Sequence, residues 1–255
     1  MKTQPAIIFS NVKKSYRHNF TSKGAIALRD LDFEITEGEV FGIIGPNGAG
    51  KSTTLKILMG FIRADCGAVS LFGQPPSLAA VHQRIGYLPE NPCLYENLTI
   101  IDHLYFAART TGFIGSVSAR IDEILHLVDL THATRLPIRR FSKGMTQRAA
   151  LAYALFHEPE LLILDEPMSG LDPLGRQLVV NLIRDYHAKG NTILFCSHIL
   201  SDVERICNRI ALMNQGTLLA ITTPTQLQAN VLPIELPKAT SPLEAFFYSS
   251  LKANK

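Results

Sequence analysis

A glycine-rich segment near the start of the chain contains the residue types that bind phosphate groups. It comprises Gly45, Pro46, Asn47, Gly48, Ala49, Gly50, Lys51, Ser52 and Thr53, and it fits the pattern G-x-x-x-x-G-K-[ST]. Glycines let backbone N–H groups close around phosphate oxygens, and a following helix adds the positive end of its dipole. Lys51 would bring a positive charge to the outer phosphates, and the Ser52 hydroxyl would bind Mg²⁺.

The residues on either side of this segment supply the structural context that the motif requires. Val40–Ile44 is a short apolar run, which predicts a buried strand. After the loop, Leu55, Leu58 and Met59 recur at helical spacing, and Gly60 follows as a stop. The sequence therefore predicts a strand, a phosphate-binding loop and a helix in that order.

A second group of chemically capable residues follows the apolar run at residues 161–164. Such a continuous apolar run is typical of a parallel strand that is buried on both faces. Asp165 and Glu166 come directly after it, at the end of the strand where α/β proteins bind ligands. Asp165 would hold Mg²⁺ through water, and Glu166 would polarise an attacking water molecule. Together with the phosphate-binding loop, these carboxylates indicate a nucleotide hydrolase.

Length and composition set limits on the class of protein. The chain has 255 residues, of which 46% are hydrophobic, and its net charge of +3 is too small to indicate a nucleic-acid partner. No apolar run approaches the roughly 18–20 residues of a membrane span, and the start does not resemble a signal peptide. We therefore expect a cytosolic protein, or one attached to a membrane by something else. The four cysteines lack metal-ligand spacing and are expected to be plain thiols.

The order of the other predicted elements indicates an α/β core with a helical insertion. Strands are predicted at residues 6–9, 31–35 and 69–72, and helices are predicted to be capped by Thr99, Ser118 and Ser142. Residues 89–158 are therefore predicted to form an all-helical insertion. A helix capped by Asp172, a strand at residues 192–196 and a hairpin around residues 214–216 are predicted to follow. The amphipathic stretch Leu243–Leu251 is expected to pack on the body of the protein.

Three further segments complete a set of motifs that carries a family resemblance. Phe141–Met145 reads Phe-Ser-Lys-Gly-Met, Ser169–Asp172 follows the two carboxylates, and Ser197-His198 follows the next strand. In this order, the motifs resemble those of the ATP-binding subunit of ABC transporters: phosphate loop, Q-loop, signature, Walker B, D-loop and switch histidine. The resemblance extends from Lys13 to about Ala220.

The resemblance implies a P-loop NTPase fold, with a RecA-like core, an N-terminal antiparallel β-subdomain and an inserted α-helical subdomain. It implies one ATPase domain over residues 1–220. The core would comprise residues 1–88 and 159–220, the helical subdomain residues 89–158, and the tail residues 221–255.

The resemblance also implies roles for individual residues around ATP and Mg²⁺. Two copies of the domain, or this chain and a paralogue, would enclose two ATP molecules head to tail. The signature residues of one copy would close on the ATP that the other copy holds. His198 would contact the γ-phosphate, Asp172 would lie in the dimer seam, and Tyr16 would stack on adenine, with Phe20 as a competitor for that role. The signature residues are Ser142, Lys143, Gly144 and Met145.

Two departures from the usual family pattern bear on these roles. The Q-loop counterpart, residues 86–90, carries a glutamate where many relatives carry glutamine. Glu90 could still bind Mg²⁺, but it adds a negative charge beside the triphosphate. In the signature, Lys143 replaces a glycine, whereas Ser142 and Gly144 keep the elements of an anion site.

The variant motifs together are similar to those of the ATPases of bacterial ABC-2-type exporters. This resemblance implies a separate transmembrane permease as a partner, attachment to the cytoplasmic face of the membrane through that permease, and export of a cargo that the sequence does not name. Two alternatives stay open. One is a soluble ABC ATPase that acts on nucleic acid or ribosomes, and the other is a degenerate nucleotide-binding structural subunit.

Overall fold

The computed structural model describes residues 4–16, 24–229, 241, 243–244 and 246–247. It divides into two compact units. The first unit comprises Met1–Val81 and Leu194–Lys255, and the second comprises His82–Ile193. Strand β7 (Thr192–Cys196) begins in the second unit and ends in the first. The fold is mixed α/β, with both antiparallel and parallel strand pairs.

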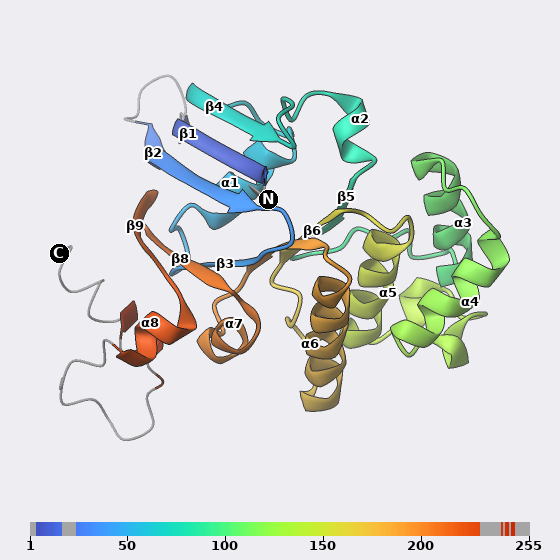
Figure 1. Cartoon of the computed structure of the whole chain (residues 1–255). Helices are drawn as coiled ribbons and strands as arrows, with labels where there is room; N and C mark the ends of the chain where they lie inside the picture. Colours follow the sequence, from blue (N-terminus) through green and yellow to red (C-terminus); the bar gives the residue numbers. More distant parts are fainter. Residues whose placement is uncertain (1–3, 17–23, 230–240, 242, 245, 248–255) are drawn as a thin grey trace. The chain divides into compact units, whose positions relative to one another are not determined.

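The first unit is rich in strands (Figure 1). Its elements besides the end of β7 are β1 (Pro5–Tyr16), β2 (Ala25–Thr36), β3 (Val40–Ile44), α1 (Lys51–Leu58), β4 (Cys66–Leu71), most of α2 (Ala79–His82), α7 (Leu200–Ile206), β8 (Arg209–Asn214), β9 (Thr217–Thr222) and α8 (Pro224–Ala229).

An antiparallel sheet of three strands forms one layer of the first unit. Its order is β2-β1-β4, with β1 in the middle (Figure 1). Phe9 of β1 pairs with Phe33 of β2, and their rings stack with centroids 4.6 Å apart. Phe33 also stacks on Phe41 of β3, at 5.6 Å, and thus connects the sheet to the strand that precedes the glycine loop. Aromatic pairs of this kind add packing energy beyond the burial of their area.

Strand β3 pairs in parallel with β8, which turns back antiparallel into β9. All five residues of β3 are buried, as the apolar run predicts. The turn between β8 and β9 has Gln215 at φ 47° and Gly216 at φ 79°. Two successive positive φ angles are those of a two-residue type I′ hairpin turn, which matches the twist of the strands. The predicted hairpin is therefore confirmed.

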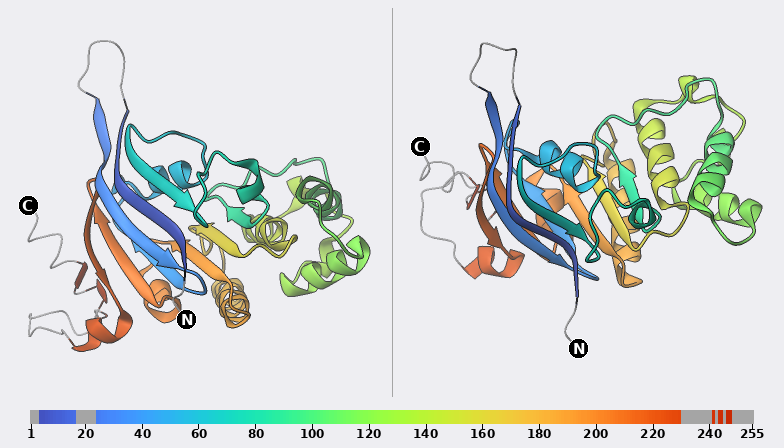
Figure 2. Two further views of the ribbon diagram at one scale, coloured as in Figure 1. Left: turned by 45° about the horizontal axis from the view of Figure 1, so that its top comes forward. Right: turned by 90° about the horizontal axis from the view of Figure 1, so that it is seen from above.

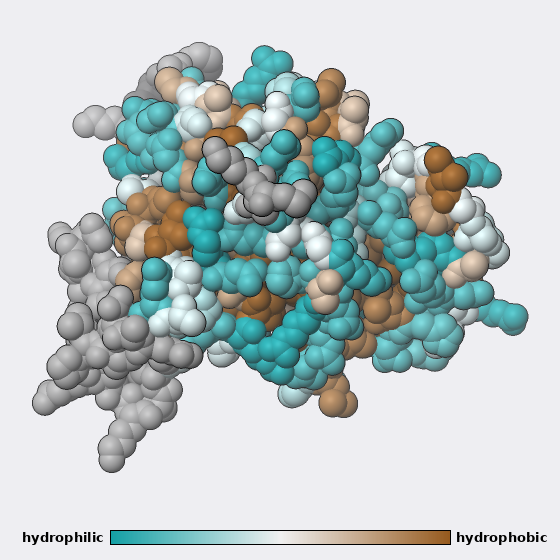
Figure 3. Space-filling model, viewed as in Figure 1, coloured by the Kyte–Doolittle hydropathy of each residue, from teal (hydrophilic) through white to brown (hydrophobic). Residues whose placement is uncertain are grey.

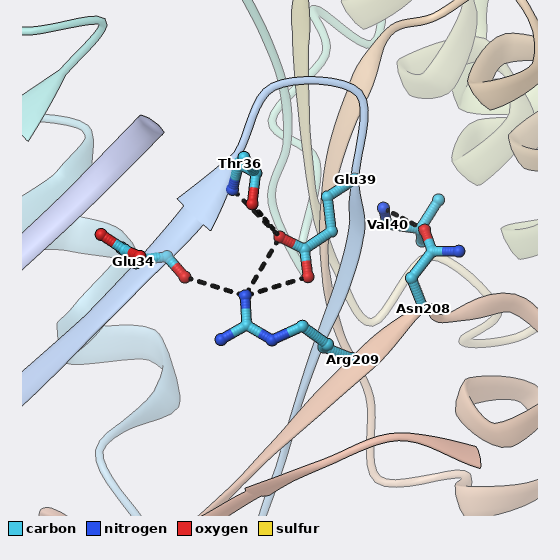
Figure 4. A network of polar contacts seen from close by, with 6 residues as sticks. All are labelled: Glu34, Thr36, Glu39, Val40, Asn208 and Arg209. Atoms are coloured by element: carbon cyan, nitrogen blue, oxygen red, sulfur yellow. Dashed lines mark hydrogen bonds and ion pairs between the residues drawn. The ribbon is translucent and has the colours of Figure 1, made fainter. Parts of the chain in front are cut away.

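A buried polar network fixes the beginning of β3 (Figure 4). The Glu39 carboxylate, 8% exposed, accepts hydrogen bonds from the backbone N–H of Thr36 at 3.0 Å and from Arg209 Nη1 at 3.1 Å. The N–H of Val40 donates to the side-chain oxygen of Asn208 at 2.7 Å. A buried carboxylate loses its hydration, and hydrogen bonds of this kind compensate for that loss. The network therefore joins the turn between β2 and β3 to the start of β8, and so fixes the beginning of the strand that leads into the glycine loop.

The second unit is mostly helical (Figure 2). Strands β5 (Ile85–Leu88) and β6 (Leu161–Asp165) pair in parallel, and α5 packs on β5. Helices α3, α4 and α5 contact one another. The helices of this unit are α3 (Ile100–Thr111), α4 (Val117–Leu127), the short 3₁₀ helices η1 (Thr131–Ala133) and η2 (Ile138–Arg140), α5 (Lys143–Leu155) and α6 (Pro173–Ala188).

The caps of these helices confirm all but one of the predicted starts. Thr99 and Asp102 form a reciprocal capping box, and Asp172 caps α6 with Pro173 at its first position. The prediction that Ser118 caps α4 is wrong. Ser116 is the cap, because it has an extended backbone and its hydroxyl accepts the N–H of Ala119, so the helix begins two residues earlier.

Among the described residues, no helix is long and apolar enough to cross a membrane. On the face shown in Figure 3, hydrophilic residues predominate and hydrophobic ones form separate patches. The predicted tail stretch at residues 243–251 lies largely outside the described residues, although Leu243 itself is fully buried. That burial agrees with packing on the body at this one position.

The buried hydroxyl of Tyr186 gives a stability test of the second unit. It donates to the carbonyl oxygen of Pro159 at 2.5 Å, and its burial raises the pKa of the phenol. We expect Tyr186→Phe to lower the free energy of unfolding by about 1–3 kcal/mol, because the Pro159 carbonyl loses its buried partner. Urea titration measures this. Tyr105→Phe, at a side chain 48% exposed, is the control, and equal stability of the two variants would contradict the prediction.

Candidate functional site

The glycine loop encloses the ammonium group of Lys51. This side chain is 8% exposed, and its Nζ donates to the carbonyl oxygens of Gly45 at 2.6 Å and Pro46 at 3.3 Å. Lys51 is the first residue of α1, whose N-cap is Gly50 at φ 104°. Only glycine adopts this backbone conformation at low cost. The loop thus holds a cation at the positive end of a helix, the arrangement that favours phosphate.

Two glycines of the loop lie where a side chain would collide with neighbouring backbone. A Cβ on Gly45 would come within 2.3 Å of the Met213 carbonyl oxygen, and one on Gly50 within 2.8 Å of the Ala27 carbonyl oxygen. The Ala49 carbonyl accepts the N–H of Gly216 at 3.0 Å. The hairpin of β8 and β9 and the strand β2 therefore hold the loop from outside, through contacts within the first unit.

The loop presents its polar residues to solvent. Asn47, Gly48 and Ser52 are exposed, and Thr53 is half-buried. The hydroxyl of Ser52 is thus accessible to a metal ion, as its predicted role requires. An enclosed ammonium, left-handed glycines and an accessible serine hydroxyl fit a triphosphate with a bound Mg²⁺. The described residues contain no group of three or more His, Cys, Asp or Glu side chains that could hold a metal on its own.

Tyr16 and His198 are the other predicted site residues of the first unit. Tyr16 ends β1 with 38% of its surface exposed, and the Lys14 ammonium lies 6.0 Å from the centre of its ring. Lys14 is itself paired with Asp65 at 2.8 Å. Hydrogen bonds from Lys14 and Ser15 lower the pKa of the Asp65 carboxyl to about 2, so Asp65 stays charged at neutral pH and holds the end of β1.

His198 follows β7 and is exposed. Phe20 lies outside the described residues.

The two carboxylates of the second unit lie at the end of β6, as predicted. Asp165 and Glu166 are 6% and 8% exposed. Glu166 has φ 50°, which is uncommon for a residue with a side chain, and the Ser169 N–H closes a turn onto its carbonyl oxygen at 3.0 Å. Left-handed backbone at a non-glycine residue costs free energy and is common at functional sites.

The signature segment forms the start of α5. The Ser142 hydroxyl caps the helix by accepting the N–H of Met145 at 3.2 Å, and both Ser142 and Lys143 are exposed. The lysine is accommodated because its aliphatic stem lies against Gly170, where a Cβ would come within 2.5 Å of it. The substitution therefore leaves the helix start intact and adds a positive charge to it.

Asp172 and Glu90 complete the predicted set. Asp172 is exposed and caps α6, with its side chain accepting the Gly175 N–H at 2.8 Å. Glu90 is exposed, two residues after the end of β5. Within the second unit, the structure brings the signature helix against the turn that follows Glu166. The predicted roles that combine residues of the two units stay predictions.

Sequence reasoning missed the role of Gln147. This residue is 3% exposed on α5, and its Nε2 donates to the carbonyl oxygens of Glu166 at 3.4 Å and Pro167 at 3.3 Å. A single signal could have indicated it, namely one glutamine on a helix face otherwise occupied by small apolar residues. The partner carbonyls are some 20 positions away, so the contact itself cannot be read from the sequence.

A largely apolar groove of about 600 Å³ was also not predicted. It lies in the second unit, beside α3, and residues from Tyr87 to Leu98 contribute to its lining. Tyr95, Tyr105 and Phe106 line it with 70%, 48% and 54% of their surfaces exposed. His103 fixes its wall, because its ring accepts the Tyr95 N–H at 2.9 Å and donates to the Thr99 carbonyl at 2.8 Å. Exposed aromatic residues gathered in this way are typical of interaction sites.

Comparison with known proteins adds independent evidence. The family model described as ABC transporter matches residues 28–169. An uncharacterized ABC transporter ATP-binding protein of Nostoc sp. is 47% identical over 85% of this chain and 66% of its own length. The linearmycin resistance ATP-binding protein LnrL of Bacillus subtilis is 37% identical, with coverages of 85% and 69%. The Nod factor export ATP-binding protein I of Burkholderia pseudomallei is 36% identical, with coverages of 87% and 72%.

Solved structures show the same fold. An ATP binding subunit of an ABC transporter superposes with a TM-score of 0.81, 30% identity and coverage of 97% of this chain and 99% of that chain. The cbiO1 protein of Clostridium perfringens, part of the ABC transporter complex cbiONQ, gives a TM-score of 0.75 at 26% identity, with coverages of 89% and 91%.

The chain therefore belongs to the ATP-binding proteins of the ABC transporter family, and its fold is that of an ABC ATPase domain. The predicted family and the predicted P-loop NTPase fold class are confirmed. The match spans just under two thirds of the Nostoc relative, 66% of its length.

The strained backbone of Gly50 gives a test of the loop. In Gly50→Ala, the new methyl group would meet the Ala27 carbonyl while φ stays positive. The loop must then shift, and we expect ATP affinity to fall by about tenfold or more, measured by calorimetry. Gly73→Ala is the matched control, because its φ is 74° but no atom lies within 4 Å of the added methyl. Unchanged affinity in Gly50→Ala would contradict the assigned role.

Proposed function

We propose that this protein binds and hydrolyses ATP to drive a separate transmembrane permease, as the ATPase subunit of an ABC-2-type exporter. The observation that carries the proposal is the buried Lys51 ammonium inside a loop of left-handed glycines at the start of α1. An α/β core does not require such a loop in order to fold, but the binding of a triphosphate requires a cation and N–H donors in this arrangement.

Lys51 and the backbone N–H groups of the loop, at residues 45 and 47–53, bind the phosphates in this proposal. Tyr16 stacks on adenine from the end of β1, where the Lys14–Asp65 pair holds the strand. Ser52, Asp165 and Glu90 are the proposed Mg²⁺ ligands, directly or through water. When bound, the ion neutralises charge on the phosphate oxygens.

Glu166 and His198 act on the hydrolysis itself. Glu166 orients and polarises the attacking water, and its buried carboxylate at a fixed turn suits a general base. His198 contacts the γ-phosphate and that water. Phosphoryl transfer depends mainly on positioning and charge stabilisation, and these two residues contribute to both together with Lys51 and the metal ion.

The signature segment acts on the ATP of a second subunit. Ser142 and Gly144, at the exposed start of α5, approach the γ-phosphate, and the charge of Lys143 adds to the helix dipole. Asp172 lies in the seam between the two subunits. A single copy would therefore hydrolyse ATP poorly, and two copies or a copy and a paralogue form the working pair.

The permease binds the apolar groove beside α3 in this proposal. The groove starts at Tyr87 and Pro89, next to Glu90, so a partner seated there is adjacent to a residue of the nucleotide site. Binding to a permease would hold the protein on the cytoplasmic face of the membrane. Export as the direction of transport is supported by the names of the relatives, one of which is a Nod factor export protein and another a linearmycin resistance protein.

Removing the general base tests the catalytic assignment. We expect Glu166→Gln to keep ATP binding but to lose turnover by about 10²- to 10⁴-fold. Because the ATP-bound pair cannot hydrolyse its ATP and separate, the variant should elute as a dimer from a size-exclusion column in Mg-ATP. Turnover like that of the wild type would contradict the assignment of the base.

Removing the loop cation tests the binding assignment. Lys51→Ala should weaken ATP binding by about tenfold to a hundredfold, since a charged hydrogen-bond partner of the phosphates is lost. Isothermal titration calorimetry measures this, with Lys56→Ala, on the same helix, as the control. Equal ATP affinity of Lys51→Ala and the wild type would show that the nucleotide binds elsewhere.

The native cysteines allow a direct test of the permease site. Cys93 lines the groove and Cys66 lies in β4 outside it, and both are exposed, whereas Cys196 and Cys207 are buried. With a thiol-directed photocrosslinker in native membranes, Cys66→Ser should yield a conjugate with a multi-pass membrane protein through Cys93. Cys93→Ser, which leaves Cys66, should not. Conjugates of equal yield from both variants would contradict this placement.

A further inference from the structure

We infer that Gln147 is a positioning residue for the catalytic carboxylate, and that it joins Glu166 to the signature end of α5. The inference rests on the proposed function of Glu166 and deepens it. Gln147 connects the segment that approaches the partner's ATP to the carboxylate that activates water at the chain's own ATP.

The carboxamide of Gln147 satisfies the backbone of the turn that carries Glu166. The Glu166 carbonyl already accepts the N–H of Ser169 at 3.0 Å, and Gln147 Nε2 approaches its second lone pair at 3.4 Å and the next carbonyl, of Pro167, at 3.3 Å. Glu166 has the left-handed φ of 50°, a conformation that needs support from its surroundings. The buried amide supplies that support from a neighbouring helix.

Burial makes this contact consequential. Gln147 is 3% exposed, and an amide buried without partners is costly. If the amide is removed, the carbonyls of Glu166 and Pro167 lose a donor that water cannot readily replace at a buried site. The turn would then relax toward ordinary backbone angles, and the Glu166 carboxylate would move with it.

The same face of α5 contacts the turn after Glu166 at two further points. Lys143 and Gly144 precede Gln147 by four and three residues, and these spacings place all three on one side of the helix. The stem of Lys143 lies against Gly170, and Gly144 faces Leu171, with 3.4 Å between its added Cβ and the leucine Cδ2. The first two turns of α5 and residues 166–171 thus form one packed piece within the second unit.

This packing has a functional consequence for a paired ATPase. The exposed start of α5 is the part proposed to meet the partner's ATP, and Glu166 is the part proposed to act on the chain's own ATP. A shift of the helix start on meeting a γ-phosphate is transmitted through Gln147 to the Glu166 backbone. The amide therefore couples occupancy of one site to the readiness of the other.

Steady-state ATPase measurements on the full chain test this inference. Gln147→Met keeps the volume and helix propensity but removes both donors. We expect kcat to fall by at least about tenfold while KM for ATP stays within about twofold, because the carboxylate and not the binding loop is displaced. Gln177→Met, on α6, is the matched control, since its carboxamide donates to Asn181 at 2.7 Å, and it should keep wild-type kcat.

Two results would overturn the inference. One is a Gln147→Met variant with kcat within twofold of the wild type. The other is a fall in kcat that is fully explained by loss of folded protein, measured by thermal melting and active-site titration. In that case, Gln147 stabilises the fold and does not position Glu166.

Backbone NMR separates this inference from the proposed function. The ¹³C shifts of Glu166 report its φ and ψ angles whether or not the protein hydrolyses ATP. In Gln147→Met they should leave the left-handed range, while in Gln177→Met they should not. Unchanged Glu166 shifts in Gln147→Met would overturn the positioning role. A wild type that binds no ATP would instead overturn the proposed function.

Discussion

The enclosed ammonium group of Lys51 is the interaction on which the site depends. A charge with 8% exposure needs acceptors, and in this chain the acceptors are the carbonyl groups of the loop itself. The loop can close around it only because Gly50 adopts φ 104° and Gly45 has no side chain to meet the Met213 carbonyl. Several other contacts support this arrangement. The hairpin of β8 and β9 packs against the loop, and the parallel pair β3–β8 and the Glu39–Arg209 network hold the strand that precedes it.

The second unit has a different constraint, because its buried carboxylate belongs to Glu166, a residue with an uncommon left-handed backbone conformation. Glu166 follows a fully buried strand and turns at once, and the Ser169 N–H closes that turn on its carbonyl oxygen. The signature helix adds further contacts through Gln147 and through the stem of Lys143 on Gly170. The lysine that departs from the usual family pattern is thus part of the packing, and the Ser142 cap of α5 is preserved beside it.

The sequence predicted the features that local chemistry determines. The strand Val40–Ile44, the helix after Gly50, the Thr99 capping box and the Asp172 cap each depend on residues within a few positions of one another, and the structure confirms them. Ser118 was mistaken for the cap of α4 because Ser116 and Ser118 have the same chemistry, and only the backbone angles choose between them. Gln147 and the aromatic groove were missed because both arise from contacts between segments distant in the chain.

The central claim is that each ATP is bound by the loop of one subunit and the signature of another, and mixing two inactive variants tests it most directly. Lys51→Ala disables the loop, whereas Ser142→Asp keeps a helix cap but sets a negative charge against the phosphate. If the sites are shared, a mixed pair has one intact site, and ATPase activity returns on mixing. If each chain forms its own site, the mixture is no more active than its components, and the account is contradicted.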